Sequence, residues 1–159
     1  MIVVQLVLYC LLLVAIVKIA VRGGAVNGLY FYPKVVQEKA FEIGLTDRET
    51  VHRQRVRCMT ALYAVLAAVP VLFIGAWNGA SDFRTAYLQA LLFLEVMNWF
   101  DGIVIDMLWV GHSPFWILPG LEDVPYVQTW GQMVKKRVTI SLVWVAGAAI
   151  IAGLVVLFF

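Results

Sequence analysis

Four long apolar stretches organise the chain, and shorter polar segments separate them. They run over about residues 2–21, 58–77, 85–110 and 138–159. Each is long enough for an α-helix, at about 1.5 Å per residue, to cross a hydrocarbon core of about 30 Å. The runs are continuous rather than alternating, which excludes a transmembrane barrel. The pattern predicts an all-α integral membrane protein built as a four-transmembrane-helix bundle.

Composition agrees with this pattern. Hydrophobic residues make up 63% of the chain and charged residues 14%, against about 45–50% and about 25% in an ordinary soluble domain. A length of 159 residues with a net charge of +2 predicts one membrane domain, residues 1–159, and no nucleic-acid partner. The two cysteines, Cys10 and Cys58, are too few for a disulfide framework.

Basic residues predict how the chain is oriented. Of the 12 lysines and arginines, all but Arg84 lie in or beside the two longer connections, residues 22–57 and 112–132. The positive-inside rule makes that side cytoplasmic, so both termini face outward, across a plasma or inner membrane. Arg53, Arg55 and Arg57 precede the second stretch, where we expect them to contact anionic headgroups of the lipid bilayer.

The first connection predicts a short interfacial helix on the cytoplasmic side. Pro33 suits the first turn of a helix, and Gly44 suits its end. Between them, Val36, Ala40 and Ile43 share one face, which is typical of a helix that lies flat at the membrane surface.

Two further features lie in the connections. Thr46 and Glu49 have the spacing of a capping box, which predicts a helix that starts with Thr46 as its cap and runs into the second stretch. Residues 112–132 hold three prolines and several aromatic residues. We expect this loop to associate with the inner leaflet through its aromatic rings.

The third stretch carries the chemistry. It holds Glu95, Asp101 and Asp106, with Asn98 among them. An ionisable side chain near the bilayer centre costs about 2.5–3.5 kcal/mol, so these acids need an interior or watery destination. At about 100° per residue, Asn98 and Asp106 lie within about 60° of Glu95, whereas Asp101 lies about 120° away. Glu95 and Asp106 are therefore expected to line one path, with Asp101 facing a different neighbour and Glu95 lacking a cationic partner.

These acids favour transport or conduction. Four short helices do not easily enclose a pathway, so the hypothesis is a homo-oligomer whose Glu95 side chains bind protons or cations near a shared cavity. Asn98, Asp101 and Asp106 would complete that pathway. The acids and Asn98 are equally compatible with a packing role, since polar side chains also join helices through hydrogen bonds.

Two alternatives stay open. The first is a membrane-embedded enzyme acting on a lipid or amphiphile, with a site at the cytoplasmic boundary; its candidates are His52, His112, Glu122 and Asp123. Their spacing matches no metal or nucleophile motif, so no metal site is predicted and the cofactor is unknown. The second alternative is an accessory or scaffold subunit that binds a larger membrane partner.

Overall fold

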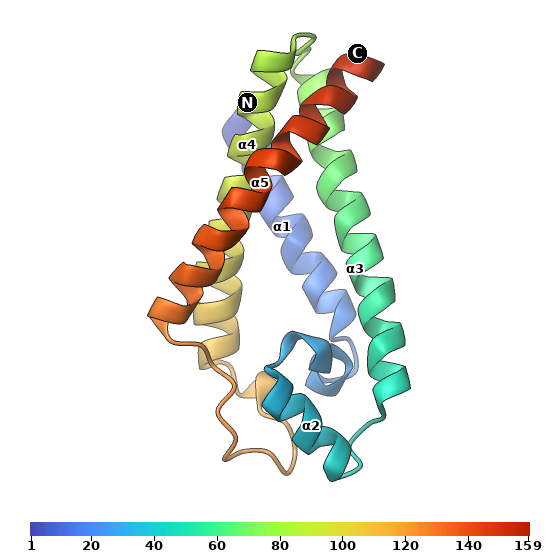
Figure 1. Ribbon diagram of the computed structural model, residues 1–159, viewed down its shortest axis with the longest axis vertical. Coiled ribbons are helices and arrows are strands. Elements are labelled where there is room, and N and C mark those ends of the chain that lie inside the picture. Colours follow the sequence, from blue (N-terminus) through green and yellow to red (C-terminus); the bar gives the residue numbers. More distant parts are fainter.

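The computed structural model describes all residues from Met1 to Phe159, and all of its regular secondary structure is helical (Figure 1). In chain order these are α1 (Ile2–Ala20), η1 (Ala25–Phe31), α2 (Lys34–Glu42), α3 (Arg48–Val71), η2 (Leu72–Trp77), α4 (Phe83–Phe100), η3 (Asp101–Val110), η4 (Pro114–Trp116) and α5 (Trp130–Phe158). Two of the short elements, η1 and η4, are 3₁₀ turns. The other two, η2 and η3, continue α3 and α4 as π-helices.

Three of these helices are long and apolar enough to cross a membrane. They are α1, the rod formed by α3 and η2, and α5. The predicted third stretch, residues 85–110, also forms a continuous rod from α4 and η3, but this rod does not meet the same criterion. Arg84, Gln89 and Glu95 reduce the apolar character of α4.

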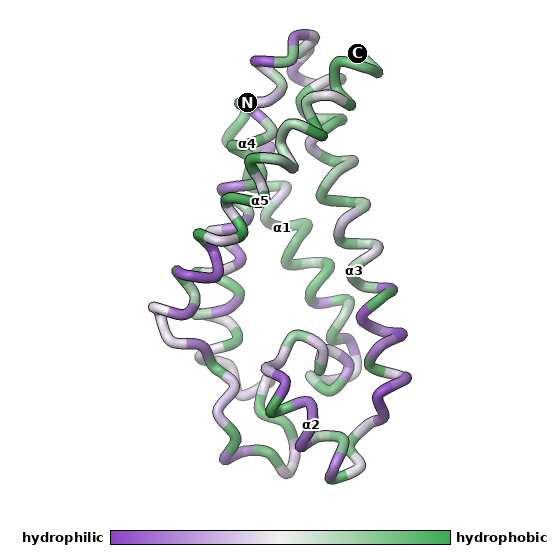
Figure 2. The backbone as a smooth tube through the Cα atoms, viewed as in Figure 1, coloured by the Kyte–Doolittle hydropathy of each residue, from purple (hydrophilic) through white to green (hydrophobic).

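The long helices run between two different ends of the molecule. Both termini and the turn between η2 and α4 lie at one end, and the two longer connections lie at the other (Figure 1). Figure 2 shows that hydrophilic residues gather on α2 and on the first turns of α3, at the connection end. Tyr9 of α1 meets Phe93 of α4 edge to face in the core, while α4 and α5 pack along each other.

Helix starts differ from the sequence prediction in two places. Asp47, not Thr46, caps α3, because its carboxylate accepts a hydrogen bond from the Thr50 amide at 2.8 Å. As predicted, α3 then runs without interruption into the apolar stretch. The last helix starts at Trp130 rather than at 138, because Thr129 and Gln132 form a reciprocal capping box. Lys135, Lys136 and Arg137 therefore belong to α5.

The two connections pack onto the protein. The predicted short helix exists as α2, where Val36 and Ala40 are buried in the core and Ile43, the third residue of the predicted apolar face, is 52% exposed. The aromatic loop folds back across the end of the bundle, where Trp116 is 2% exposed. The Tyr32 hydroxyl donates a hydrogen bond to the Trp116 carbonyl at 2.7 Å, which joins the two connections to each other.

Candidate functional site

A buried arginine on α5 forms the centre of the site. Arg137 is 3% exposed, and its guanidinium pairs with two carboxylates of η3. Its Nη1 lies 2.6 Å from Asp101 Oδ2, and its Nη2 lies 2.5 Å from Asp106 Oδ2. A buried cation without such partners is strongly unfavourable, so each carboxylate stabilises the position of Arg137.

The π-helical geometry of η3 explains why both acids reach one arginine. On an ordinary α-helix, residues five apart point about 140° away from each other. A π-helix joins each residue to the one five positions along, so Asp101 and Asp106 lie above one another. The expectation that Asp101 faces a different neighbour from Asp106 is therefore wrong.

Gly102 allows α5 to approach η3 closely at this point. A Cβ atom on Gly102 would lie 2.8 Å from Arg137 Nε and 2.9 Å from Met133 Sδ. Both distances are shorter than real Cβ contacts allow. The absence of a side chain at position 102 is thus a condition for the Arg137 position.

Asp106 is the most heavily bonded acid. Its Oδ2 also accepts hydrogen bonds from Gln128 Nε2 at 2.9 Å and from Lys136 Nζ at 3.1 Å. Its Oδ1 accepts no hydrogen bond from the protein, and Arg137 Nε is buried without a partner. We call Asp101, Asp106, Lys136 and Arg137 the charged cluster; its four formal charges sum to zero.

Glu95 and Asn98 lie on α4, before the two aspartates in the chain, and form hydrogen bonds with α5. Asn98 Nδ2 donates to the Arg137 carbonyl at 3.0 Å and to Ser141 Oγ at 3.2 Å. Ser141 Oγ donates to Glu95 Oε2 at 2.6 Å. Glu95 therefore has a partner within its own chain, although no cation contacts it. The structure does not place Glu95 beside Asp106 on one open path.

Two cavities meet at Asp101. The loop-side cavity has a volume of about 250 Å³, and its polar lining consists of Asp101, Asp106, Gln128 and Lys136, with apolar walls from α1, α3 and the aromatic loop. The side cavity has a volume of about 280 Å³ and is lined by Asn98, Asp101, Arg137 and apolar residues of α1, α3 and α5. Leu13, Leu62 and Asp101 line both. The ion pair between Asp101 and Arg137 thus stands at the boundary between them.

Each cavity has its own way to the outside. The loop-side cavity shares Tyr32, Tyr126 and Lys136 with a wider depression at the connection end of the molecule. The side cavity includes Tyr63 of α3 and Val143 of α5, and both side chains are more than half exposed on the flank of the bundle. One cavity therefore faces the connection end, and the other faces sideways between α3 and α5.

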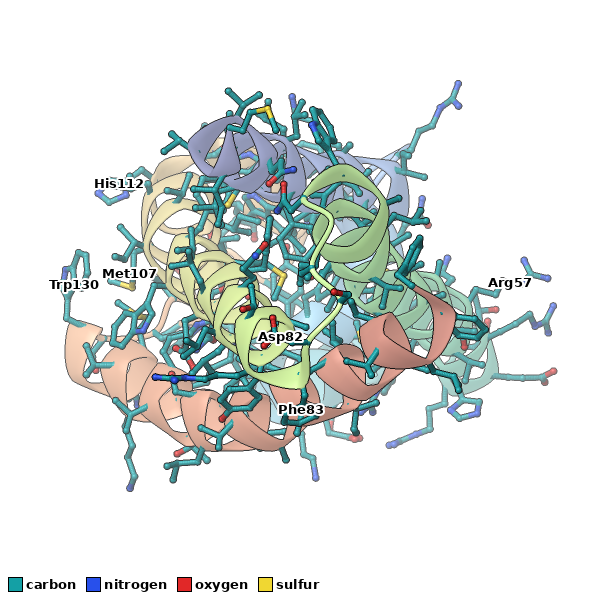
Figure 3. All side chains as sticks on the ribbon, turned by 90° about the horizontal axis from the view of Figure 1, so that it is seen from above. Arg57, Asp82, Phe83, Met107, His112 and Trp130 are labelled. Carbon is teal, nitrogen blue, oxygen red and sulfur yellow. The ribbon has the colours of Figure 1, made fainter.

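The predicted boundary residues do not converge. His52 is exposed, and His112 Nδ1 lies 2.9 Å from the Met107 carbonyl, with its ring at the periphery of the molecule (Figure 3). Glu122 accepts a hydrogen bond from the Gly120 amide within its own turn, and Asp123 is exposed. No three His, Cys, Asp or Glu side chains are arranged to hold a metal ion.

Local hydrogen bonds and burial set the pKa values at the connection end. The pKa of Glu122 is lowered by hydrogen bonds from its own amide and from the Gly120 amide. Burial raises the pKa of Tyr32, so its hydroxyl stays protonated and keeps its bond to Trp116. Neither group therefore changes its charge near physiological pH.

The basic residues of α3 stay on its surface. Arg53 pairs with Glu49 one helical turn earlier at 3.0 Å, while Arg55 and Arg57 are exposed. Figure 3 shows Arg57 extending away from the bundle. Their positions leave them free to meet a headgroup layer, as proposed from the sequence.

Sequence reasoning missed the central residue of the site. By its position in the sequence, Arg137 belongs with Lys135 and Lys136 to a basic segment just before the fourth apolar stretch. The spacing of Thr129 and Gln132 is a signal that could have located it, because a helix starting at residue 130 has Arg137 two turns inside. Ser141 and Gln128 carry no comparable signal.

Comparisons with family models, with curated proteins and with solved structures find no match to this chain. The chemistry of the site is therefore the basis for a functional assignment.

Proposed function

We propose that the protein is a membrane transporter in which Asp101 takes up and releases a proton. The α1 helix, α3 with η2, α4 with η3, and α5 cross the bilayer as a four-helix bundle, with both termini outward and the connections cytoplasmic. This topology is supported by the common end of the two termini (Figure 1) and by the basic residues at the other end.

One observation carries the proposal: Asp101 borders two cavities that open in different directions. A transporter needs a group that can be reached by two separate routes, and here one route leads to the connection end and the other to the flank between α3 and α5. Asp101 has this position, and the side chain with which it pairs, Arg137, lines only the side cavity of the two.

The charges suggest how the boundary between the two cavities opens and closes. With Asp101 ionised, its bond to Arg137 closes the boundary. Protonation removes one of the two negative partners of Arg137, and Asp106 alone then holds the guanidinium. The weakened attraction lets the side chains separate and connects the two cavities.

Glu95 has a smaller part in this proposal than the sequence suggests. Its carboxylate is engaged by Ser141, and it lines neither cavity. We therefore assign proton exchange to Asp101, with Asp106 holding Arg137 in place. The separation of His52, His112, Glu122 and Asp123 gives no support to the enzyme alternative.

Proton flux into vesicles tests the proposal. The full chain, reconstituted into phospholipid vesicles that enclose a pH-sensitive dye, is given an imposed pH gradient. We expect Asp101→Asn to lower the flux at least tenfold, because the amide has nearly the same shape and cannot carry the proton. Glu95→Gln should retain at least half of the flux.

The matched control is Asp123→Asn, the same chemical change at an exposed position, which should leave flux unchanged. Unchanged or increased flux in Asp101→Asn contradicts proton exchange at Asp101. Loss of flux in Glu95→Gln with normal flux in Asp101→Asn would return the role to Glu95.

A further inference from the structure

The loop-side cavity has the shape and lining of a binding site for an amphiphile. Thirteen of its 17 lining residues are hydrophobic, and they include Trp116, which is almost fully buried. Its charged residues, Asp101, Asp106 and Lys136, belong to the charged cluster. An apolar body can thus pack on the walls while a polar head reaches the cluster.

The hydrogen-bonding capacity of the two carboxylates limits which polar head the amphiphile can have. Asp101 and Asp106 each use Oδ2 to hold Arg137, and Asp106 Oδ1 accepts no hydrogen bond from the protein. Ionised carboxylates only accept, so a head that reaches Asp106 Oδ1 must donate. A carboxylate head would instead face two like charges.

The formal charge of the cluster defines the head further. Asp101 and Asp106 are matched by Arg137 and Lys136, so the site is neutral before a ligand arrives. A cationic head would add an unmatched charge to a partly buried site, and this is unfavourable. An uncharged donor, such as a hydroxyl, is the head that fits both requirements.

The side cavity indicates where such a molecule enters. It joins the loop-side cavity at Leu13, Leu62 and Asp101 and opens between α3 and α5, on the flank that faces lipid in the proposed topology. A lipid-soluble molecule has direct access there.

We infer that the protein binds an uncharged amphiphile with a hydroxyl-type head and an apolar tail, which enters between α3 and α5 and places its head at Asp101 and Asp106. This inference names the substrate class of the proposed transporter and rests on that function for its physiological meaning. The binding itself is measurable without transport.

Photo-crosslinking tests the binding. The full chain in phosphatidylcholine vesicles is exposed to two probes with the same 12-carbon, diazirine-bearing tail, one an alcohol and one a carboxylic acid, at a pH where the acid is ionised. Mass spectrometry then locates the labelled residues. We expect the alcohol to label cavity residues such as Leu13, Met59 and Leu62, with at least tenfold less labelling by the acid. Excess unlabelled dodecanol should suppress the cavity label.

Two pairs of variants sharpen the result. Leu62→Trp fills the junction of the two cavities and should remove at least nine-tenths of the cavity label, whereas Leu142→Trp, on the exposed face of α5, should leave it intact. Asp106→Asn gives the cluster a net positive charge and should raise labelling by the acid severalfold. The corresponding change at Asp123 should not.

The outcomes separate binding from transport. Labels confined to outward-facing residues, or equal cavity labelling by alcohol and acid, overturn the binding site. Specific cavity labelling without proton flux overturns the proposed transport and leaves the binding site standing. Proton flux without cavity labelling does the reverse.

Discussion

Two polar clusters join helices at opposite ends of this molecule, and they differ in how completely their polar atoms are hydrogen-bonded. Near the termini, Gln5, Asn78 and Gln89 form an amide cluster. Gln5 and Asn78 exchange two hydrogen bonds of 2.8 and 3.1 Å, and Asn78 donates a third to Gln89 at 2.7 Å. Near the connections, the charged cluster has one buried atom without a partner, Arg137 Nε, and borders two cavities.

The contrast separates a structural role from a functional one. Neutral amides with satisfied partners stabilise packing and have no proton to exchange near physiological pH. A buried charged group is costly to retain, and replacing it by apolar residues is often neutral or stabilising. Packing alone therefore does not explain why the charged cluster is present, and this favours a chemical role for it.

Removing Arg137 should have the largest effect. Arg137→Met leaves Asp101 and Asp106 partly buried without their shared cation, and breaking a buried ion pair costs about 3–5 kcal/mol. Unfolding of the detergent-solubilised protein, followed by circular dichroism in denaturant, measures the loss. A stability equal to wild type would show that the acids do not depend on Arg137.

Disrupting the amide cluster should cost less and leave transport intact. Asn78→Ala removes three hydrogen bonds and leaves the fully buried Gln5 side chain unsatisfied, a loss of about 1–3 kcal/mol. The same unfolding measurement gives the stability, and vesicle flux gives the activity. Reduced flux at a temperature where the variant is fully folded would contradict the division of roles between the clusters.

Crowding the charged cluster should have a smaller effect on stability. In Gly102→Ala, the new Cβ meets Arg137 and Met133, and overpacking of this kind costs about 1–3 kcal/mol. We expect the lower end of that range, because both neighbours are flexible side chains. Gly153→Ala is the matched control, since nothing lies within 4 Å of its added Cβ; a glycine-to-alanine change there should be neutral or stabilising.

The smallest effect concerns the cap of α3, outside both clusters. A hydrogen bond from the Thr50 amide lowers the pKa of Asp47. Because its folded-state pKa is lowered, the contribution of ionised Asp47 is full above its ordinary pKa and is lost as pH falls through the lowered value. Melting temperatures measured across acid pH should therefore converge for wild type and Asp47→Asn. Parallel curves would contradict the cap, and Asp123→Asn provides the baseline.

The fold was largely predictable from the sequence, because apolar stretches of this length are typical of long helices. The rods over the four stretches and the short helix before α3 are all present. Their starts were harder to predict. Thr46 and Asp47 are both competent caps, and only the geometry around Thr50 shows which one is used.

The site was predictable only in part. Sequence patterns located the acids of the third stretch because charges are rare in apolar segments. They did not locate Arg137 or reveal that Asp101 and Asp106 share it, because α-helical spacing places the two acids on different faces and the backbone there is π-helical. A change in helix type has no simple sequence pattern, and it reverses which side chains share a face.

The distance along the chain between Arg137 and its partners has a consequence for biosynthesis. Asp106 is made 31 residues before Arg137, so in the proposed topology a growing chain presents two unneutralised acids to the membrane until α5 emerges from the ribosome. In that topology, retention of α4 and η3 in the bilayer is conditional on completion of α5. A chain released before Arg137 is made would then expose those acids to lipid.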